Sequence, residues 1–373
     1  MEAVKEKTDL KTQEYFVNMG PQHPSTHGVL RLMLGLDGEI ITSIQPHIGY
    51  VHRSIEKMCE FDNYRQIVHL TDRMDYLSSH TSNEAVSMLI ENALEIEVSD
   101  RVKVIRTIFD ELSRISSHQL WWASVGMDLG ALTAFLYGFR DREMINDIFE
   151  ETCGARLTMN YNVPGGLMFD IHPNFQKRVK EFITHFKTKL PEYDQLLSDN
   201  VIFRMRTEGI GVISKEDAIS FGLSGPTARA SGVALDLRKS HPYMAYDRVD
   251  FESIVMDSGD TYARYKVRIL EMWESMKIIE QLIDNIPEGD IQAPTKALIK
   301  LPKGEFYQRV ETARGDFGVY VVSEGGKSPY RLKFRSPSFS NLFSLTQMAV
   351  GGKIADLVAM MATLDIVVPD IDR

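Results

Sequence analysis

The amino-acid sequence predicts an α+β protein that is predominantly helical, with a central helical core and small β-sheets contributed by the N-terminal and C-terminal regions. Two patterns indicate this class. Apolar residues recur at helical spacing over most of residues 54–290, whereas strand patterns occur only near the two ends. The 373 residues are 43% hydrophobic and 25% charged, the composition of a globular protein long enough to bury a large core.

The first predicted elements are strands within residues 14–50. Leucine occupies every second position of residues 30–36, which is the period of a strand with one buried face. Asp37-Gly38 is a hairpin signal, and EIITSI, residues 39–44, continues as the returning strand. We therefore expect a small antiparallel sheet at this end of the chain.

The stretch GPQHPSTHG, residues 20–28, lies between two of these strands. Its histidines, His23 and His27, are four residues apart, a spacing that binds metals on a helix. Pro24 excludes a helix here, because it has no backbone N–H and biases the preceding residue toward an extended conformation. We expect a stiff loop that presents its side chains to a ligand or to another part of the protein.

Helical spacing and capping signals place the next elements. Helices are expected from Ser99-Asp100, from Thr133 to about Glu151, from Asn174 to Leu197, from the capping sequence SKED at 214–217, and from Tyr262 to Ile286. Residues 304–335 return to strands and turns, and two last helices follow. The expected divisions are an extension (1–13), the β-sheet region with the histidine loop (14–53), the helical core (54–290) and a C-terminal α/β region (291–373).

Composition and motifs exclude several classes of function. A net charge of −10 argues against a nucleic-acid partner. Two cysteines, Cys59 and Cys153, are too few for a structural zinc or iron–sulfur site, and no nucleotide-binding glycine motif is present. Without a signal peptide or a run of 18 apolar residues, we expect a cytoplasmic protein, or one bound to the cytoplasmic face of a membrane through partners.

Four polar clusters are candidates for chemistry: His23 with His27, the stretch 72–76 (DRMDY), Asp128 between two glycines, and Ser336 with Ser338. Each also has a purely structural interpretation. For His23 with His27 it is hydrogen bonding of the loop to nearby backbone, and for residues 72–76 it is a helix end with an ion pair of Arg73 to Asp72 or Asp75. For Asp128, and for Ser336 with Ser338, it is the N-cap of the helix that follows.

Several motifs together closely resemble one family. They are, in order, GPQHPSTHGVLRL, PHIGYVHR, DRMDYL, DELSRISSH, GMDLGALT, RASGV, ETARGDFGVYVVSEGGKSPYR and RSPSFSNL. This set resembles the 49-kDa-type (D-type) subunit of respiratory complex I, the proton-pumping NADH:quinone oxidoreductase, over about residues 16–373. That family is similar to the large subunit of nickel–iron hydrogenases, whose two metal-binding cysteine pairs are absent here. DRMDYL and the terminal TLDIVVPDIDR look like their counterparts.

The resemblance implies that the cavity emptied of metal holds a quinone headgroup, with no metal bound by this chain. It assigns the two proton donors to His27 and Tyr76 and makes Asp128 the partner of His27. It also implies that the residues around His27 form a loop that contacts the quinone. The loop residues are His23, Pro24, Ser25, Thr26 and Gly28. Electrons would come from a 4Fe-4S cluster in a neighbouring small subunit, with Arg53 and Arg73 near that cluster.

The family also implies an assembly. The partners would be the small iron–sulfur (B-type) subunit, a C-type peripheral subunit and an H-type membrane-arm subunit, at the cytoplasmic face of the bacterial inner membrane. Loss of the His27 proton would leave Asp128 unpaired, and we expect this imbalance to start the movement that drives pumping. Two alternatives stay open: a non-catalytic scaffold that docks the iron–sulfur subunit to the membrane arm, and a hydrogenase large subunit.

The sequence departs from the family at three places, of which one, Ile366 where a proline is common, has no functional meaning attached. Residues 287–303 form a shorter segment than in relatives, with an expected effect on a surface or partner contact. Thr158 stands where many relatives carry a histidine that links the cluster potential to pH. A threonine does not titrate near neutral pH, and the resulting lower potential would suit menaquinone.

We therefore predict that the midpoint potential of the neighbouring cluster is almost independent of pH between about pH 6 and pH 8, because no imidazole at position 158 gains a proton on reduction. Redox titration of the cluster in the purified complex measures this. A slope of one proton per electron in that range would contradict the prediction.

Overall fold

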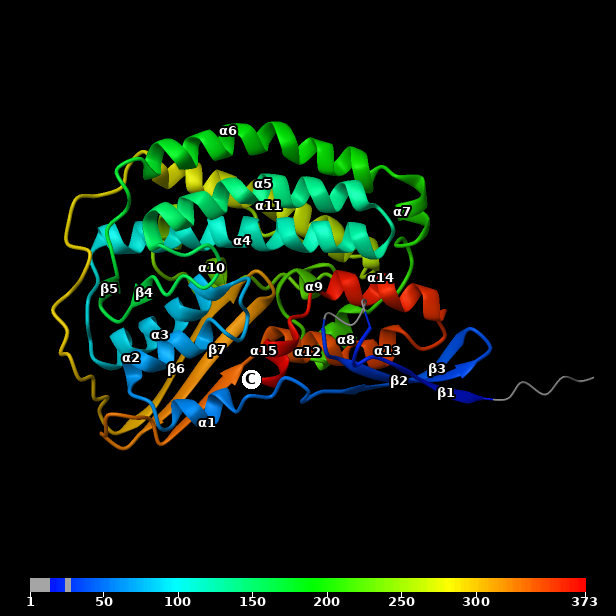
Figure 1. Cartoon of the computed structure of the whole chain (residues 1–373), viewed down its shortest axis with the longest axis horizontal. Helices are drawn as coiled ribbons and strands as arrows, with labels where there is room; N and C mark the ends of the chain where they lie inside the picture. Colours follow the sequence, from blue (N-terminus) through cyan, green and yellow to red (C-terminus); the bar gives the residue numbers. More distant parts are fainter. Residues whose placement is uncertain (1–13, 24–27) are drawn as a thin grey trace, which may run out of the picture.

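The structure, a computed structural model, describes residues 14–23 and 28–373. Its longest helices form one layer, in which they run side by side (Figure 1). These helices are α4 (Asp100–Asp128), α5 (Leu132–Cys153), α6 (Phe175–Tyr193) and α11 (Thr261–Ile283). They confirm the predicted α+β class with its helical core.

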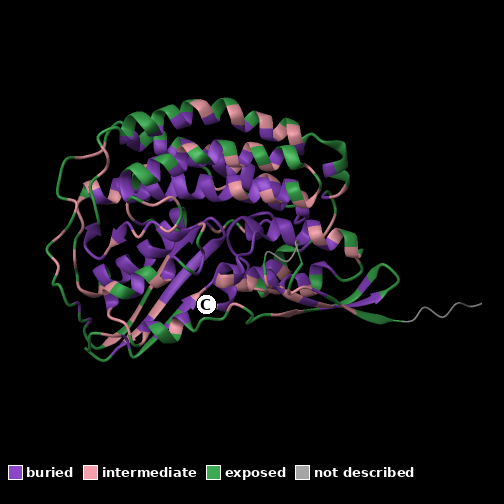
Figure 2. Cartoon of the chain, viewed as in Figure 1, coloured by how far each residue is buried: buried purple, intermediate pink, exposed green. Residues whose placement is uncertain are grey.

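Helix α4 lies on the side of this layer that faces the shorter elements and is buried almost throughout, whereas α6 lies on the opposite side and exposes its outer face (Figure 2). The predicted N-cap is confirmed, since the Ser99 hydroxyl accepts a hydrogen bond from the backbone N–H of Val102 at 3.2 Å. Gly138 of α5 allows the two helices to approach closely: a Cβ at this position would lie 2.8 Å from the carbonyl oxygen of Gln119. The centre of the molecule is therefore a tightly packed helix pair.

The second layer contains shorter elements, which come before, between and after the long helices in the chain (Figure 1). Its helices on the N-terminal side are α1 (Ile55–Cys59), α2 (Tyr64–Thr71) and α3 (Ser79–Ala93). The middle of the chain adds α8 (Lys215–Ser220), α9 (Gly225–Arg229), α10 (Leu237–Ser240) and the short turn η3 (Tyr246–Arg248), whereas α7 (Val201–Met205) lies at the end of the long-helix layer (Figure 1). The C-terminal helices are α12 (Pro337–Phe343), α13 (Leu345–Met348), α14 (Ile354–Leu364) and α15 (Val368–Asp372).

Two three-stranded antiparallel sheets lie in this layer, as the sequence predicts for the two ends of the chain. Their strands are β1 (Tyr15–Met19), β2 (Arg31–Asp37), β3 (Ile40–His47), and β6 (Gly304–Thr312), β7 (Gly315–Ser323), β8 (Arg331–Arg335). A two-stranded hairpin, β4 (Asn162–Val163) and β5 (Gly166–Leu167), stands apart. The alternating leucines of β2 point into a core shared with α14, and the Asp37-Gly38 hairpin is confirmed.

Several predicted helices differ from the structure. The helix expected to reach Ile286 ends as α11 at Ile283. The helix expected to reach Leu197 ends as α6 at Tyr193, and Asp194–Ser198 form one wider π-helical turn. Pro191 precedes this turn and removes a backbone donor from the regular helical pattern. After β8 there are four short helices instead of the expected two, partly because Asp365 adopts a left-handed conformation that ends α14.

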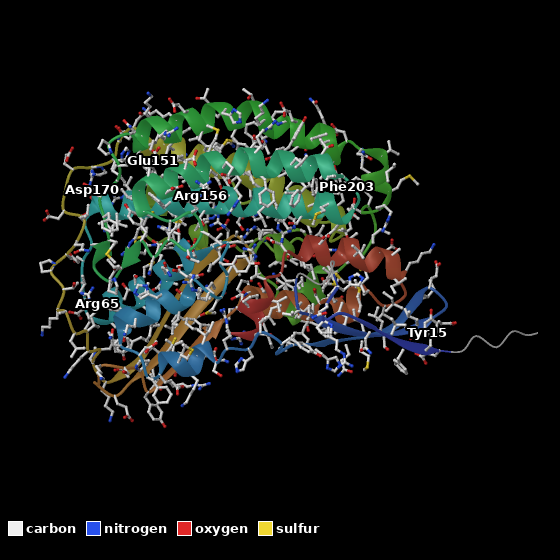
Figure 3. All side chains as sticks on the ribbon, in the orientation of Figure 1. Tyr15, Arg65, Glu151, Arg156, Asp170 and Phe203 are labelled. Carbon is white, nitrogen blue, oxygen red and sulfur yellow. The ribbon has the colours of Figure 1, made fainter. Side chains whose placement is uncertain are left out.

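The short segment 287–303 runs along one edge of the molecule, where Figure 3 labels Arg65. Arg65 donates hydrogen bonds to the Thr295 hydroxyl at 2.7 Å and to the Lys296 carbonyl at 3.1 Å. The backbone N–H of Leu167 donates to the Ile291 carbonyl at 2.9 Å. These contacts hold the segment against α2 and β5. Its expected effect on a partner contact stays a prediction.

Candidate functional site

Segments far apart in the sequence meet around the buried guanidinium of Arg314. Arg314 lies in the turn between β6 and β7. Its Nη1 is 2.9 Å from Oδ2 of Asp75, and its Nη2 is 3.1 Å from Oδ1 of Asp365. Burial disfavours the charged guanidinium, but the two carboxylates outweigh that effect and raise the pKa of Arg314. We call Asp75, Arg314 and Asp365 the carboxylate–arginine triad.

The turn that carries Arg314 is clamped by close backbone contacts. A Cβ on Gly225, which has a φ of +65°, would lie 2.5 Å from the Arg314 carbonyl oxygen, so only glycine fits. The Ser224 hydroxyl accepts a hydrogen bond from the backbone N–H of Asp316 at 3.2 Å, and the Thr312 hydroxyl donates to the Gly315 carbonyl at 2.9 Å. The guanidinium therefore points at the two carboxylates from a fixed position.

The C-terminal segment brings a second motif to the same place. The carboxylate of Asp372 accepts hydrogen bonds from the backbone N–H groups of Gly49 and Val51, both at 2.8 Å. His52 Nδ1 lies 2.6 Å from the carbonyl oxygen of Asp372. DRMDYL and the terminal segment thus lie together, and Asp372 also ties the PHIGYVHR motif to them.

Tyr76 lies at the open side of the triad, with 38% of its surface exposed. Burial of part of the ring raises the pKa of the phenol, Arg314 acts in the opposite direction, and Asp75 and Asp365 raise the pKa further. The phenol therefore keeps its proton at neutral pH and can donate a hydrogen bond. Among the described residues, Tyr76 is the predicted catalytic side chain that lies directly beside the triad.

The structural interpretation of residues 72–76 as a local ion pair of Arg73 is wrong. Asp75 pairs with Arg314 instead, and the Arg73 side chain is exposed. Asp72 is buried, and burial raises the pKa of its carboxyl to about 7. Arg53 Nη2 donates to the Arg73 carbonyl at 2.5 Å, so the two predicted cluster arginines lie next to each other on the surface.

Asp128 is the last residue of α4 and does not cap α5, whose N-cap is Ala131. The capping interpretation of Asp128 is therefore wrong, although the Ser336 cap of α12 is confirmed. Burial raises the pKa of the Asp128 carboxyl to about 6. The residues His23 and Gly28 pair across the ends of the predicted quinone loop.

The rest of that loop, Pro24, Ser25, Thr26 and His27, lies outside the described residues. The pairing of His27 with Asp128 and the role of His27 as a proton donor therefore stay predictions. Thr158 is half-buried, and its neighbour Leu157 accepts a hydrogen bond from the Ser79 hydroxyl at 2.8 Å. This contact brings the Thr158 segment to the start of α3, close to DRMDYL.

Both cysteines are buried thiols in different elements, α1 and α5, and they form no disulfide. Burial raises the pKa of the Cys59 thiol to about 12, which disfavours the thiolate that a metal requires. In the described part of the chain, no three histidine, cysteine, aspartate or glutamate side chains are grouped as a metal site would need. Over the same residues, no helix has the length and apolar composition to cross a membrane.

The sequence motifs contain Arg314 and Asp365, but the resemblance assigns a role to neither residue. One signal in the sequence could have identified Arg314. Its long cationic side chain stands in a two-residue turn, between Thr312 and Gly315, and such a side chain must extend away from the sheet. The signal for Asp365 was its place in the counterpart of a lost cysteine pair.

The fold and the site together define a protein of the hydrogenase-large-subunit type, in which a carboxylate–arginine triad joins the two segments that look like counterparts of the cysteine pairs. Comparison with solved structures supports this class. A chain of the membrane-bound sulfane sulfur reductase, an archaeal respiratory membrane complex, superposes with a TM-score of 0.94 at 35% identity, covering 98% of this chain and 100% of that chain.

The family follows from sequence comparison. The model of the family described as respiratory-chain NADH dehydrogenase, 49 Kd subunit, matches residues 128–299 and 295–373. The C/D subunit of the NADH-quinone oxidoreductase of Bacteroides thetaiotaomicron is 57% identical over 97% of this chain and 68% of that protein. The D subunit of the Bacillus mycoides enzyme is 46% identical over 97% of this chain and 100% of that protein. The chain belongs to the family of 49-kDa subunits of respiratory NADH dehydrogenases.

The triad generates a prediction about stability. Arg314→Met should leave Asp75 and Asp365 as buried, unpaired charges and lower the free energy of unfolding by about 3–5 kcal/mol, so that little complex assembles. The amount of assembled complex in membranes, measured by native electrophoresis, tests this.

The matched control is Arg156→Met. Arg156 also pairs with several carboxylates, those of Glu143, Asp147 and Glu150, but it lies on the outer surface where Figure 3 labels it. Exposed pairs contribute about 0–1 kcal/mol each, so this variant should assemble normally. Equal amounts of complex for the two variants would contradict the importance of the triad.

Proposed function

We propose that this chain forms the site at which a respiratory NADH-quinone oxidoreductase reduces quinone. The single observation that carries the proposal is the half-exposed phenol of Tyr76 beside the carboxylate–arginine triad, at the junction of the two segments that look like counterparts of the hydrogenase cysteine pairs. Relatives named as the D subunit of NADH-quinone oxidoreductase, one of them matched over its full length, supply the reaction class.

Reduction of a quinone to a quinol needs two electrons and two protons, and each carbonyl oxygen receives one proton. A proton donor must lie within hydrogen-bond reach of the oxygen that it serves. Tyr76 is the first donor, and its phenol is protonated at neutral pH. His27 with Asp128 is the proposed second donor, and His23, Pro24, Ser25, Thr26 and Gly28 hold it in the loop.

The triad sets the charge that Tyr76 experiences. Arg314 stabilises a phenolate at Tyr76, whereas the carboxylates of Asp75 and Asp365 destabilise it. Burial and the two carboxylates outweigh Arg314 and raise the pKa of the phenol, so it releases its proton only when electrons place negative charge on the quinone oxygen. This arrangement couples proton donation to electron arrival.

The electrons come from outside the chain. Two buried cysteines in different elements do not fit an iron–sulfur cluster, so the 4Fe-4S cluster belongs to the neighbouring small subunit. The adjacent, exposed side chains of Arg53 and Arg73 are suited to face that cluster. Fixed positive charge there stabilises its reduced, more negative state and raises its potential.

The same proposal covers the assembly. The solved relative is part of a respiratory membrane complex. We place this chain at the cytoplasmic face of the bacterial inner membrane, in a peripheral position beside the small iron–sulfur (B-type) subunit, with a C-type peripheral subunit and an H-type membrane-arm subunit as further partners. The lower cluster potential expected from Thr158 favours menaquinone as the substrate.

Replacement of Tyr76 by phenylalanine tests the site. It removes one proton donor and keeps the ring, so donor-driven quinone reduction in membranes should fall at least about 100-fold. Reduction of ferricyanide by the same donor should be retained, because it needs only the upstream electron path. Retention of both activities would contradict the proposal and favour a scaffold that docks the iron–sulfur subunit. If both activities are lost, a second variant, Tyr76→Met, which also lacks the hydroxyl but has a flexible side chain, should retain ferricyanide reduction alone.

Asp128→Asn tests the link to pumping. Loss of the His27 proton no longer leaves an unpaired charge at position 128 in this variant, so proton translocation per quinone reduced should fall. Proton uptake by inverted vesicles, divided by the rate of quinone reduction, measures the coupling. Full coupled turnover in Asp128→Asn would refute the role of this charge.

A further inference from the structure

Buried polar residues lead away from the proposed quinone site, between α3 and α4. Figure 1 shows α3 beneath α4 and beside the strands β6 and β7, and these elements pack against one another. We call these residues the α3–α4 seam. From the quinone site outward, its members are Arg314, Ser78, Ser117, Thr81, His80, Asp110, Glu84, Tyr243, Arg106 and Glu91.

The inner end of the seam is joined to the triad. Nη1 of Arg314 donates to the hydroxyls of Ser78 and Ser117, at 3.3 Å and 3.1 Å. Thr81 stands three residues after Ser78, on the same side of α3, and Asp110 precedes Ser117 by two turns of α4. The Thr81 hydroxyl donates to Oδ1 of Asp110 at 3.0 Å, so the two helices meet here.

The middle of the seam holds a carboxyl pair. His80 Nδ1 lies 2.9 Å from Oδ1 of Asp110, which leaves Oδ2 of Asp110 facing Glu84. Within the described part of the chain, Oδ2 of Asp110 and both carboxyl oxygens of Glu84 receive no hydrogen bond from a donor group. A proton on Glu84, donated to Asp110, satisfies both groups. Burial and the Asp110 charge raise the pKa of Glu84, which therefore holds this proton at neutral pH.

The outer end of the seam reaches water. A groove of about 780 Å³ lies over this end, and Glu91 and Tyr243 line it although both are largely buried. Arg106 binds Glu91 in a bidentate pair, at 2.9 Å and 2.7 Å. Glu84 and Glu91 are seven residues apart on α3, so they lie on one face of the helix, two turns from each other.

We propose that the α3–α4 seam carries the protons consumed by quinone reduction from the water in this groove to the quinone site, with Glu84 as the relay residue. Each transfer breaks one O–H or N–H bond and forms another. Glu84 passes its proton to Asp110, the hydroxyls of Thr81, Ser78 and Ser117 pass a proton on to the Tyr76 phenolate that quinone reduction leaves, and water in the groove returns a proton to Glu84. The electrons take no part in the path, and two protons enter per quinone reduced.

A purely structural role does not account for Glu84. A buried carboxyl whose only direct partner is another carboxyl contributes no stability that an apolar side chain of similar size would not also give. By contrast, the nearby buried carboxylates Glu91 and Glu111 each face an arginine, as structural ion pairs do. Glu84 is thus the member of the seam whose chemistry is that of a proton carrier.

The proposal rests on the proposed quinone site, so its test compares Glu84→Gln with Tyr76→Phe in the same membranes. Glutamine keeps the shape of the side chain but releases no proton. Donor-driven quinone reduction should fall about 10-fold or more, its solvent deuterium isotope effect should rise, and ferricyanide reduction should be unchanged. Glu84→Asp should restore part of the rate, because it restores the titratable group.

The matched control is Glu274→Gln. Glu274 is also a buried glutamate, but it lies on α11 and pairs with Lys277 outside the seam, so the rate and the isotope effect should both stay at the wild-type value. If Glu84→Gln also keeps both values while Tyr76→Phe loses quinone reduction, the seam is not the proton path and the quinone site stands. If Tyr76→Phe too retains quinone reduction, the proposed function fails with it.

A second variant decides the case in which Glu84→Gln does not assemble. Thr81→Val removes the hydroxyl between Asp110 and the serines and preserves the shape of the side chain. A slower quinone reduction with a larger solvent isotope effect and unchanged ferricyanide reduction supports the path. A wild-type rate and isotope effect in Thr81→Val overturns it.

Discussion

The ion pairing of one buried cation determines how this chain comes together. Arg314 has no exposure to solvent, so its charge needs compensating partners inside the protein. Asp75 and Asp365 meet that requirement from opposite directions along the sequence. The turn between β6 and β7, the segment before α3 and the segment after α14 must therefore converge, and the proposed quinone site lies where they do.

The same constraint acts repeatedly where the two layers meet. Arg229 of α9 pairs with Glu311 of β6 at 2.7 Å and also with Glu271 of α11, while Arg106 of α4 pairs with Glu91 of α3. Each pair joins two different elements. A sliding or rotation of either element would leave a buried charge without its partner, so the pairs fix how the helices and strands are aligned.

The local elements could be predicted because their signals are local. The Ser99 cap, the Asp37-Gly38 hairpin and the alternating leucines of β2 each depend on residues within a few positions. The triad could not be predicted from the residues alone, since its members acquire their roles only through tertiary contact. The motif resemblance pointed to Tyr76, which lies beside the triad, but it gave Arg314 no role. Local reasoning also assigned Asp128 to a cap that the backbone forms elsewhere.

The separation of the triad in the sequence has a consequence for synthesis on the ribosome. Asp75 precedes Arg314 by 239 residues. During translation, the Asp75 carboxyl therefore exists without its partner long before the cation emerges, and closing so long a loop is entropically unfavourable without the helices between. The proposed quinone site is completed only when nearly the whole polypeptide is available.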